Sequence, residues 1–408
     1  MFGGVVAAAL VVGLVQTPDP ATPSTRLSMA EPYVAPGEIE WRRFGLQNGA
    51  QVIVQRFPES REISVQIWVN SVDAAETPET HGRRHLLEHL LARGPEGYDR
   101  QIESLGLFTT AETTRDTMQF EVRGPADRLA AAVQALRPIV TPPRPTAEDI
   151  AREIEIMREE SALRPRSRLL SERLWRAAFG DAGLDPFGNL DQMASATPET
   201  LSELHRTLFV GGNLLVTVAG PMSIDEGRRL GASLVEHLPR REPGRRGTRR
   251  EFPEGDASWQ VQEARGAARG IAVGPFTQPS TAHALAAAFA VASEVPAPFV
   301  IHTPSRQPGL VIVGSVDAPD DFARFFAAGS AASRSVLFET GRALAREWAN
   351  RWRTSPSGAN TLRGRLAVQG AGPGLEIFLH NLDAMTADEF EAAMDRFYAA
   401  RTAAGGNR

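Results

Sequence analysis

The sequence of 408 residues is long enough for two domains of about 200 residues each, or for three smaller ones. With 42% hydrophobic and 23% charged residues, it has the composition of a globular protein rather than that of a disordered or membrane-embedded one. A net charge of -5, with 44 basic against 49 acidic residues, gives little support to nucleic-acid binding. No cysteine is present, so any metal site must be built from histidine and carboxylate side chains.

The first residues resemble a signal for export. Residues 5–15 form an apolar run that is too short to span a bilayer, and a proline-rich segment follows at 18–23. No Lys or Arg precedes the run, and no clean small-x-small cleavage site follows it. We therefore expect a periplasmic or secreted protein without a stable membrane span, with residues 1–37 as signal peptide and disordered lead. A start codon assigned too early or a disordered tail is the alternative.

The first half of the chain alternates between strand and helix patterns. Short runs rich in Val, Ile and Trp predict strands, and longer runs with apolar residues every three to four positions predict helices. Thr146 is the expected N-cap of one long helix, and Pro165 closes it. The expected strands cover residues 51–57, 63–70, 117–123 and 213–219, and the expected helices cover 83–93, 99–105, 126–139, 146–163, 167–179 and 198–209.

An arginine-rich segment separates this half from the next. Residues 239–255 hold arginines among proline and glycine with almost nothing apolar, which is typical of a solvated linker; contact with an acidic surface is the alternative. The second half continues with expected strands at 270–273, 310–316 and 376–380 and expected helices at 282–294 and 336–352.

A weak internal repeat relates the two halves. Thr197, Leu201 and Leu208 have the same spacing as Thr386, Phe390 and Phe397, near the end of each half. The chain therefore reads as an N-terminal domain over 38–238, a linker over 239–255, a C-terminal domain over 256–401 and a tail over 402–408.

The helix expected at 83–93 has two chemically different faces. At about 100° per residue its four leucines share one side, while His85, Glu88 and His89 lie together on the other, and Gly94 supplies the stop. Two histidines at i and i+4 project imidazoles from successive turns, as needed to bind one Zn²⁺. Ordinary polar residues on the solvated face of an amphipathic helix are the alternative. His81 extends the series upstream, but Gly82 places it in a loop.

The glutamate between the two histidines suggests hydrolytic chemistry. Zinc lowers the pKa of a bound water to roughly 7, and a neighbouring carboxylate can accept the proton and pass it to a leaving amine. The position of Glu88 fits that role of general base. A catalytic zinc also needs a third protein ligand and one open position.

The long helix at 146–163 offers that third ligand. Its apolar stripe leaves Glu159 on the opposite, solvent side and Glu160 on the flank, so Glu160 is the better ligand. Glu153 falls within about 20° of Glu160 on the helical wheel and could support a ligand by hydrogen bonding.

These patterns together resemble the M16 metallopeptidases, which include pitrilysin, insulin-degrading enzyme and the mitochondrial processing peptidases. The likeness rests on the His85-x-x-Glu88-His89 motif, on Glu153 and Glu160, and on further matching positions from about 40 to 220. Those further positions are Asn70-Ser71, Gly82, Gly94, Glu103-Ser104-Leu105-Gly106, Ala111, Thr113, Asp116 and Thr117.

The resemblance implies an α+β fold of two sequential, homologous-looking α/β sandwich domains, the second shortened. It also implies zinc at His85, His89 and Glu160, Glu88 as general base, and a peptide or unfolded polypeptide bound as an added strand along 108–113. Thr110 stands where the family has asparagine. The second half has no clear copy of the family's substrate-holding Arg and Tyr, and Phe299 lies where the Tyr is expected. The alternative to an active endopeptidase is therefore a metal-binding subunit or scaffold that needs a partner, either a second copy or another M16-like chain.

Overall fold

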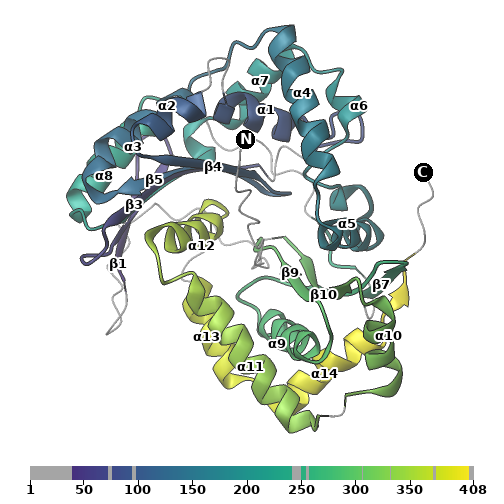
Figure 1. Cartoon of the computed structure of the whole chain (residues 1–408). Helices are drawn as coiled ribbons and strands as arrows, with labels where there is room; N and C mark the ends of the chain where they lie inside the picture. The colour runs from purple at the N-terminus through teal and green to yellow at the C-terminus, as the bar shows by residue number, and fades with distance from the viewer. Residues whose placement is uncertain are drawn as a thin grey trace.

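The computed structural model describes residues 39–71, 76–93, 98–240, 250–253, 257–305, 307–330, 332–370 and 374–403. Two separate β-sheets, each covered by helices, confirm the α+β class (Figure 1). The expected signal peptide and most of the arginine-rich linker lie outside the described residues. Within them, no helix is long and apolar enough to cross a membrane.

The first sheet has six strands in the order β1-β2-β6-β3-β5-β4. Its outer face is apolar and buried beneath helices, because alternate residues such as Val65, Ile67 and Val69 point to that side. β4 lies at one edge, as expected for a strand that binds a peptide. The strands are β1 (Glu40–Gly45), which the sequence reading missed, β2 (Gln51–Arg56), β3 (Glu62–Asn70), β4 (Phe108–Thr113), β5 (Thr117–Pro125) and β6 (Leu214–Gly220).

The second sheet has five strands in the order β11-β7-β8-β10-β9. It is antiparallel except for the short pairing of β11 with β7. The strands are β7 (Ser258–Glu263), β8 (Gly266–Val273), β9 (Pro298–His302), β10 (Gly309–Val316) and β11 (Arg401–Thr402). The strands of the two sheets are thus sequential along the chain; the exact domain boundaries stay a prediction.

Most of the predicted helices begin and end close to their predicted positions, but the helices at 190–193, 224–235, 319–328, 356–368 and 387–398 were not predicted. Thr146, Thr197 and Thr386 are N-caps with capping boxes, which fix three of the starts. In the first half the helices are α1 (Arg83–Arg93), α2 (Tyr98–Ser104), α3 (Leu129–Ala135), α4 (Ala147–Ala162), α5 (Arg166–Phe179), α6 (Leu190–Met193), α7 (Pro198–Leu208) and α8 (Ile224–Val235). In the second half they are α9 (Pro279–Glu294), α10 (Pro319–Ala328), α11 (Arg334–Arg351), α12 (Pro356–Val368), α13 (Gly374–Ala384) and α14 (Ala387–Tyr398).

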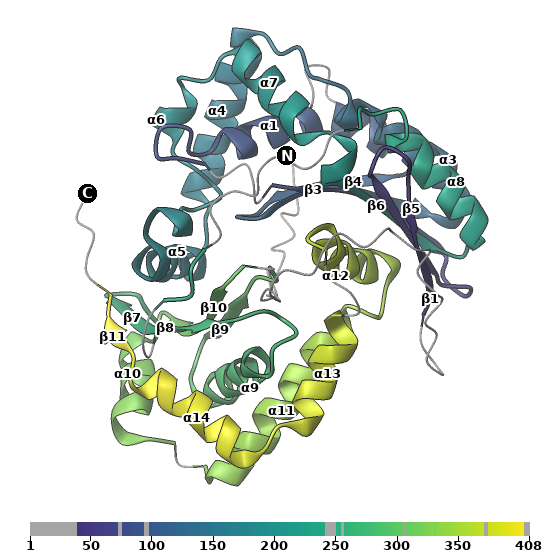
Figure 2. The ribbon, with the colours of Figure 1, turned by 180° about the vertical axis from the view of Figure 1, so that it is seen from behind.

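Each half contributes one helix that packs on the sheet of the other half (Figures 1 and 2). α12 of the second half lies on the inner face of the first sheet, where Ala367 packs with Ile53, Trp68 and Leu215. α5 of the first half lies on the second sheet. Leu170, Leu174 and Trp175 of α5 pack there against Ala257, Trp259 and Ile312. Each sheet is therefore completed by the other half.

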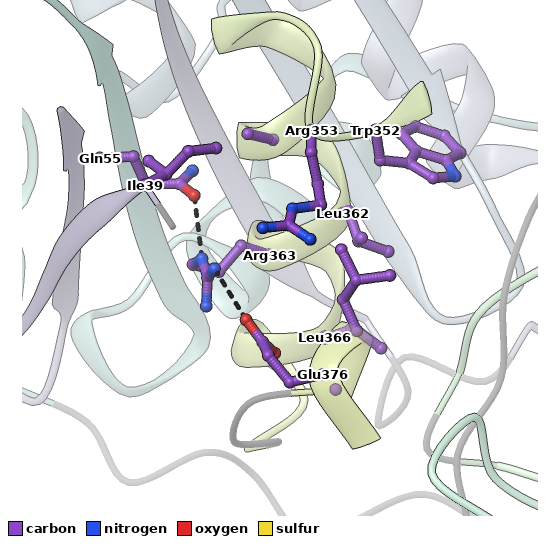
Figure 3. A pocket seen from close by; sticks show the side chains of 11 residues that line it. Ile39, Gln55, Trp352, Arg353, Leu362, Arg363, Leu366 and Glu376 are labelled. Atoms are coloured by element: carbon purple, nitrogen blue, oxygen red, sulfur yellow. Dashed lines mark hydrogen bonds and ion pairs between the residues drawn. The ribbon is translucent and has the colours of Figure 1, made fainter. Parts of the chain in front are cut away.

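The contact between α12 and the first sheet is polar as well as apolar. Buried Asn360 receives a hydrogen bond from Gln55 Nε2 (2.8 Å) and donates to the Ser64 carbonyl (2.8 Å). Arg363 donates to Gln55 (2.9 Å) and pairs with Glu376 at the start of α13 (3.4 Å), as Figure 3 shows. These pairs fix the register of α12 against β2 and β3.

Three predictions need correction. The strand expected at 376–380 is wrong: these residues lie in α13, where Leu375, Phe378 and Leu382 form a buried stripe at helical spacing. The single helix expected at 126–139 ends at Ala135 and continues as a short 3-10 turn that contains Pro138, because proline lacks an N–H for the helix. Arg250, expected in a solvated linker, is buried and ion-paired.

Candidate metal centre

α1 carries the two histidines and starts at a tightly built turn. Glu76 Oε1 accepts hydrogen bonds from the backbone N–H groups of Gly82 (3.1 Å) and Arg84 (2.9 Å) and so supplies acceptors at the helix start. His81 lies in the preceding turn, as predicted. Gly82 adopts a φ of 98° and lies so close to Gly188 that a Cβ on Gly188 would come within 2.2 Å of the Gly82 Cα. The loop before α6 is thereby pressed against the beginning of α1.

Three predicted ligands come together. One ligand atom each from His85, His89 and Glu160 lie within 4.8 Å of one another, and they form the only such three-residue group among the described residues. Glu160 Oε2 is 3.4 Å from His89 Nε2 and 4.0 Å from His85 Nε2. Ligands about 2.0–2.1 Å from a tetrahedral zinc would be separated by about this much, so the donor set and spacing fit Zn²⁺. Glu160 is half exposed, which leaves the site open on one side.

Each histidine is held through its other ring nitrogen. His85 Nδ1 lies 3.0 Å from the carbonyl oxygen of Phe187, and His89 Nδ1 lies 3.4 Å from Glu153 Oε2. These acceptors favour a proton on Nδ1 and leave both Nε2 atoms free for a metal. Glu153 thus has the supporting position predicted for it, whereas the part played by Phe187 was not predicted.

The charges around the ligands reinforce one another. Burial by itself lowers the pKa of His89, but hydrogen bonds with Glu153 and Glu160 outweigh it and raise the pKa to about 9. The hydrogen bond with His89 in turn lowers the pKa of Glu160. The two glutamates therefore create a negative environment that favours a cation, whether a proton on His89 or a metal ion.

Glu88 is placed differently from the ligands. It is buried, and its Oε2 has no hydrogen-bond partner among the described residues. Burial raises its pKa, against the opposing effect of His85, His89 and the Thr113 side chain. A buried carboxylate oxygen without a partner among the described residues, beside His85 and His89, is available to a water molecule or a substrate group.

The edge strand β4 ends beside this centre. Thr113, its last residue, is close enough to affect the pKa of Glu88. β4 pairs with β5 on one side, and no other described strand pairs with its outer edge. Glu112 on β4 also pairs with buried Arg365 of α12, so the second half contacts this strand.

A loop that the sequence reading did not single out supports the centre from outside. Asp185 Oδ1 accepts from the Phe187 N–H (3.0 Å), and its other oxygen pairs with Arg164, one turn beyond Glu160. The Asp185 carbonyl oxygen also lies 2.6 Å from His81 Nε2. Only the local Asp-Pro-Phe-Gly sequence at 185–188, a turn signal, could have pointed to this loop.

Sequence comparisons find related proteins for the part that carries the centre. Residues 51–185 match the family described as insulinase (peptidase family M16). The mitochondrial-processing peptidase subunit β of Dictyostelium discoideum is 25% identical over 191 residues, which cover 44% of this chain and 40% of that protein. A Bacillus subtilis protein described as an uncharacterized zinc protease, YmxG, is 21% identical over 45% of this chain and 47% of its own length. The matches thus span less than half of these relatives.

Solved structures extend the likeness to most of the fold. A protease from Helicobacter pylori superposes with a TM-score of 0.71 at 14% identity and covers 88% of this chain and 97% of that one. A chain described as a peptidase M16 inactive domain, from Pseudomonas fluorescens, gives a TM-score of 0.69 at 15% identity over 90% and 99%. The predicted resemblance to the M16 metallopeptidases is therefore confirmed, in sequence for residues 51–185 and in fold for most of the chain.

Proposed function

We propose that this protein is a zinc-dependent endopeptidase in which His85, His89 and Glu160 hold the metal and Glu88 is the general base. The observation that carries the proposal is the position of Glu88, buried with an unpartnered oxygen beside three side chains that converge on one point. Zinc, when bound, would supply a Lewis acid for the peptide carbonyl and make a water molecule more acidic.

The protein's own groups would then perform the remaining steps. An extended peptide adds to the free edge of β4 through backbone hydrogen bonds, which places its carbonyl near the end of the strand at Thr113. Glu88 accepts the proton of the attacking water and donates it to the departing amine nitrogen as the C–N bond breaks. A carboxylate suits both transfers, because it can first accept a proton and then release it.

A second candidate is a metal-binding subunit that hydrolyses peptides only with another M16-like chain. The mitochondrial-processing relatives are named as β subunits, which favours this reading. Within the described residues, the second half offers no metal-binding group of its own. A homodimer or a heterodimer would satisfy this proposal.

The variant Glu88→Gln tests the proposed chemistry. It keeps the size and polarity of the side chain but cannot accept a proton. Bound zinc should stay near one per chain, while hydrolysis of a mixed peptide library should fall by roughly 10²-fold or more. Glu159→Gln, on the exposed side of α4, is the matched control and should leave both unchanged.

The two candidates are separated by testing the purified chain alone and with a related chain. Activity of the chain alone supports the first candidate, and activity only in the mixture supports the second. Unchanged hydrolysis by Glu88→Gln in both settings would rule out Glu88 as the base.

A further inference from the structure

A small pocket lies between the two halves, at the end of β4 and the turn that follows it. Glu112 and Arg115 from the β4–β5 region, Arg168 and Trp175 from α5, Pro186, and Ser305 of the second half contribute to its walls. Two of these residues adjoin the centre in sequence, since Glu112 precedes Thr113 and Pro186 precedes Phe187, whose carbonyl contacts His85. The chain therefore connects the pocket to the metal centre at two points.

The charged groups around this pocket do not balance. Glu112 is paired with Arg365, and Asp116 with Arg250 (2.7 Å), so each of these carboxylates is matched by its own guanidinium. Arg115 and Arg168, by contrast, share the single carboxylate of Glu172. One guanidinium is therefore in excess at the pocket.

Arg168 is the member of this group that remains accessible. Its Nε lies 3.0 Å from Glu172 Oε1, and within the described residues the structure shows no hydrogen bond from its two Nη nitrogens. Its side chain is 27% exposed, against 9% for Arg115, which is fixed over the Trp175 ring at 4.1 Å. Two adjacent guanidinium nitrogens without partners suit a carboxylate, which they can bind with two parallel hydrogen bonds.

We propose that this pocket, through Arg168, binds a carboxylate of the peptide substrate close to the bond that is cleaved. The proposal rests on the proposed function, because it takes the peptide to lie along β4. Glu112 and Thr114 line the pocket and flank Thr113 at the end of β4, so a peptide paired with β4 passes the pocket within about two residues of that end.

The size of the pocket limits which group it can take. The space totals about 340 Å³, which includes solvent at its mouth, and its enclosed part has room for about one water molecule. One carboxylate oxygen can enter such a space while the rest of the group stays at its mouth, whereas an aromatic ring cannot enter it. The carboxylate could belong to an Asp or Glu side chain or to the C-terminus of a short peptide.

Peptide binding to full-length, zinc-loaded Glu88→Gln protein tests the proposal without requiring turnover. The probes are fluorescent peptides that differ only by Asp or Asn at one position, scanned along the peptide, each with a free or an amidated C-terminus. We expect Asp to bind at least about 10-fold more tightly than Asn at one position, or the free acid to exceed the amide by that factor. The first result identifies a side chain and the second a terminal carboxylate.

Variants of α5 then assign the effect to Arg168. The affinity ratio is that of the Asp peptide to the Asn peptide, or of the free acid to the amide. Arg168→Gln should reduce this ratio to below about 2. Arg168→Lys should retain part of the preference, because lysine keeps the charge without the paired nitrogens. Arg173→Gln is the control, since Arg173 lies on the same helix, is 63% exposed and pairs with Glu263. It should leave the ratio unchanged. Thermal unfolding of each variant shows that the fold is retained.

A ratio near 1 in the Glu88→Gln protein, or a ratio that survives Arg168→Gln, would overturn the pocket assignment. Failure of the proposed function has a different signature. In that case the protein with intact Glu88 would hydrolyse neither peptide of the pair, while the binding ratio would still report on the pocket.

Discussion

α1 and α9 show how differently the two halves use a similar arrangement. Each helix follows the first strands of its half and packs near its sheet, but α1 presents His85, Glu88 and His89 to an open centre. α9 is rich in alanine, and its side chains are buried on most sides. Its one histidine, His283, lies 3.9 Å from Glu389 and joins no three-residue metal-binding group within the described residues. The proposed chemistry therefore lies on α1 in the first half, whereas α9 contributes packing to the second half.

The largest effect should come from removing a histidine of α1. His85→Ala or His89→Ala should lower bound zinc from about one per chain to nearly none, because two protein ligands rarely retain a catalytic zinc. Metal content after dialysis measures this. His283→Ala, the equivalent change on α9, should leave zinc in place. Full zinc in both α1 variants would abolish the proposed distinction between the halves.

A smaller effect is expected at the third ligand. Glu160→Gln should release zinc to a mild chelator more readily than Glu159→Gln, since only position 160 has its oxygen within 3.4 Å of His89 Nε2. The loss of zinc affinity should equal or exceed roughly 10- to 100-fold, which is the usual effect of removing a residue that only hydrogen-bonds to a metal ligand. The opposite order would place the ligand one residue earlier.

The packing role of α9 can be tested at its closest contact. A Cβ at Gly341 of α11 would come within 2.2 Å of the Ala286 carbonyl oxygen on α9, so Gly341→Ala forces the two helices apart. We expect the free energy of unfolding to fall by about 1–3 kcal/mol in urea, with zinc content unchanged. A neutral result would mean that α9 and α11 have room to separate.

A dependence of stability on pH is also expected, and both halves should share it. Burial lowers the pKa of His302 to about 3 in the second half and that of His205 to about 4 in the first. Unfolded histidines titrate near 6.5, so below that pH the unfolded chain binds more protons. The contribution of these two histidines to the free energy of unfolding should therefore be fully present above pH 6.5. It should decline as the pH falls toward their pKa values in the folded protein.

The decline should reach at most about 1.4 kcal/mol per pH unit for each histidine. Urea titrations between pH 5 and 7 would measure it, and His302→Gln should flatten the slope. A slope that does not change in this variant would show that folding does not lower the pKa of His302.

The sequence predicted the centre well where the interactions are local. His85, Glu88 and His89 lie within one helix, so their spacing alone places them on one face. Glu160 could be chosen over Glu159 because the apolar stripe of α4 orients the helix. The support of His85 by the Phe187 carbonyl could not be foreseen, because a backbone oxygen leaves no mark on the pattern of side chains.

Ion pairs between residues far apart in the sequence could not be predicted either. Asp116 and Arg250 are 134 residues apart, and nothing local distinguishes Arg250 from the other arginines of its segment. The error at α13 has a different cause. Residues 376–380 are a short run containing Ile377, Phe378 and Leu379, and periodicity alone does not separate a strand from a helix over so few residues.

The exchange of α5 and α12 has a consequence for how such a chain can be divided. If the second half were removed, Ile53, Trp68 and Leu215 would lose the helix that shields them from water, and removal of the first half would uncover Trp259 and Ile312 in the same way. We therefore expect that a cut in the connecting segment would leave two fragments that stay associated, because α5 and α12 each pack on the sheet of the other fragment. The two halves are separate in sequence, but we expect neither to be a stable unit when it is expressed alone.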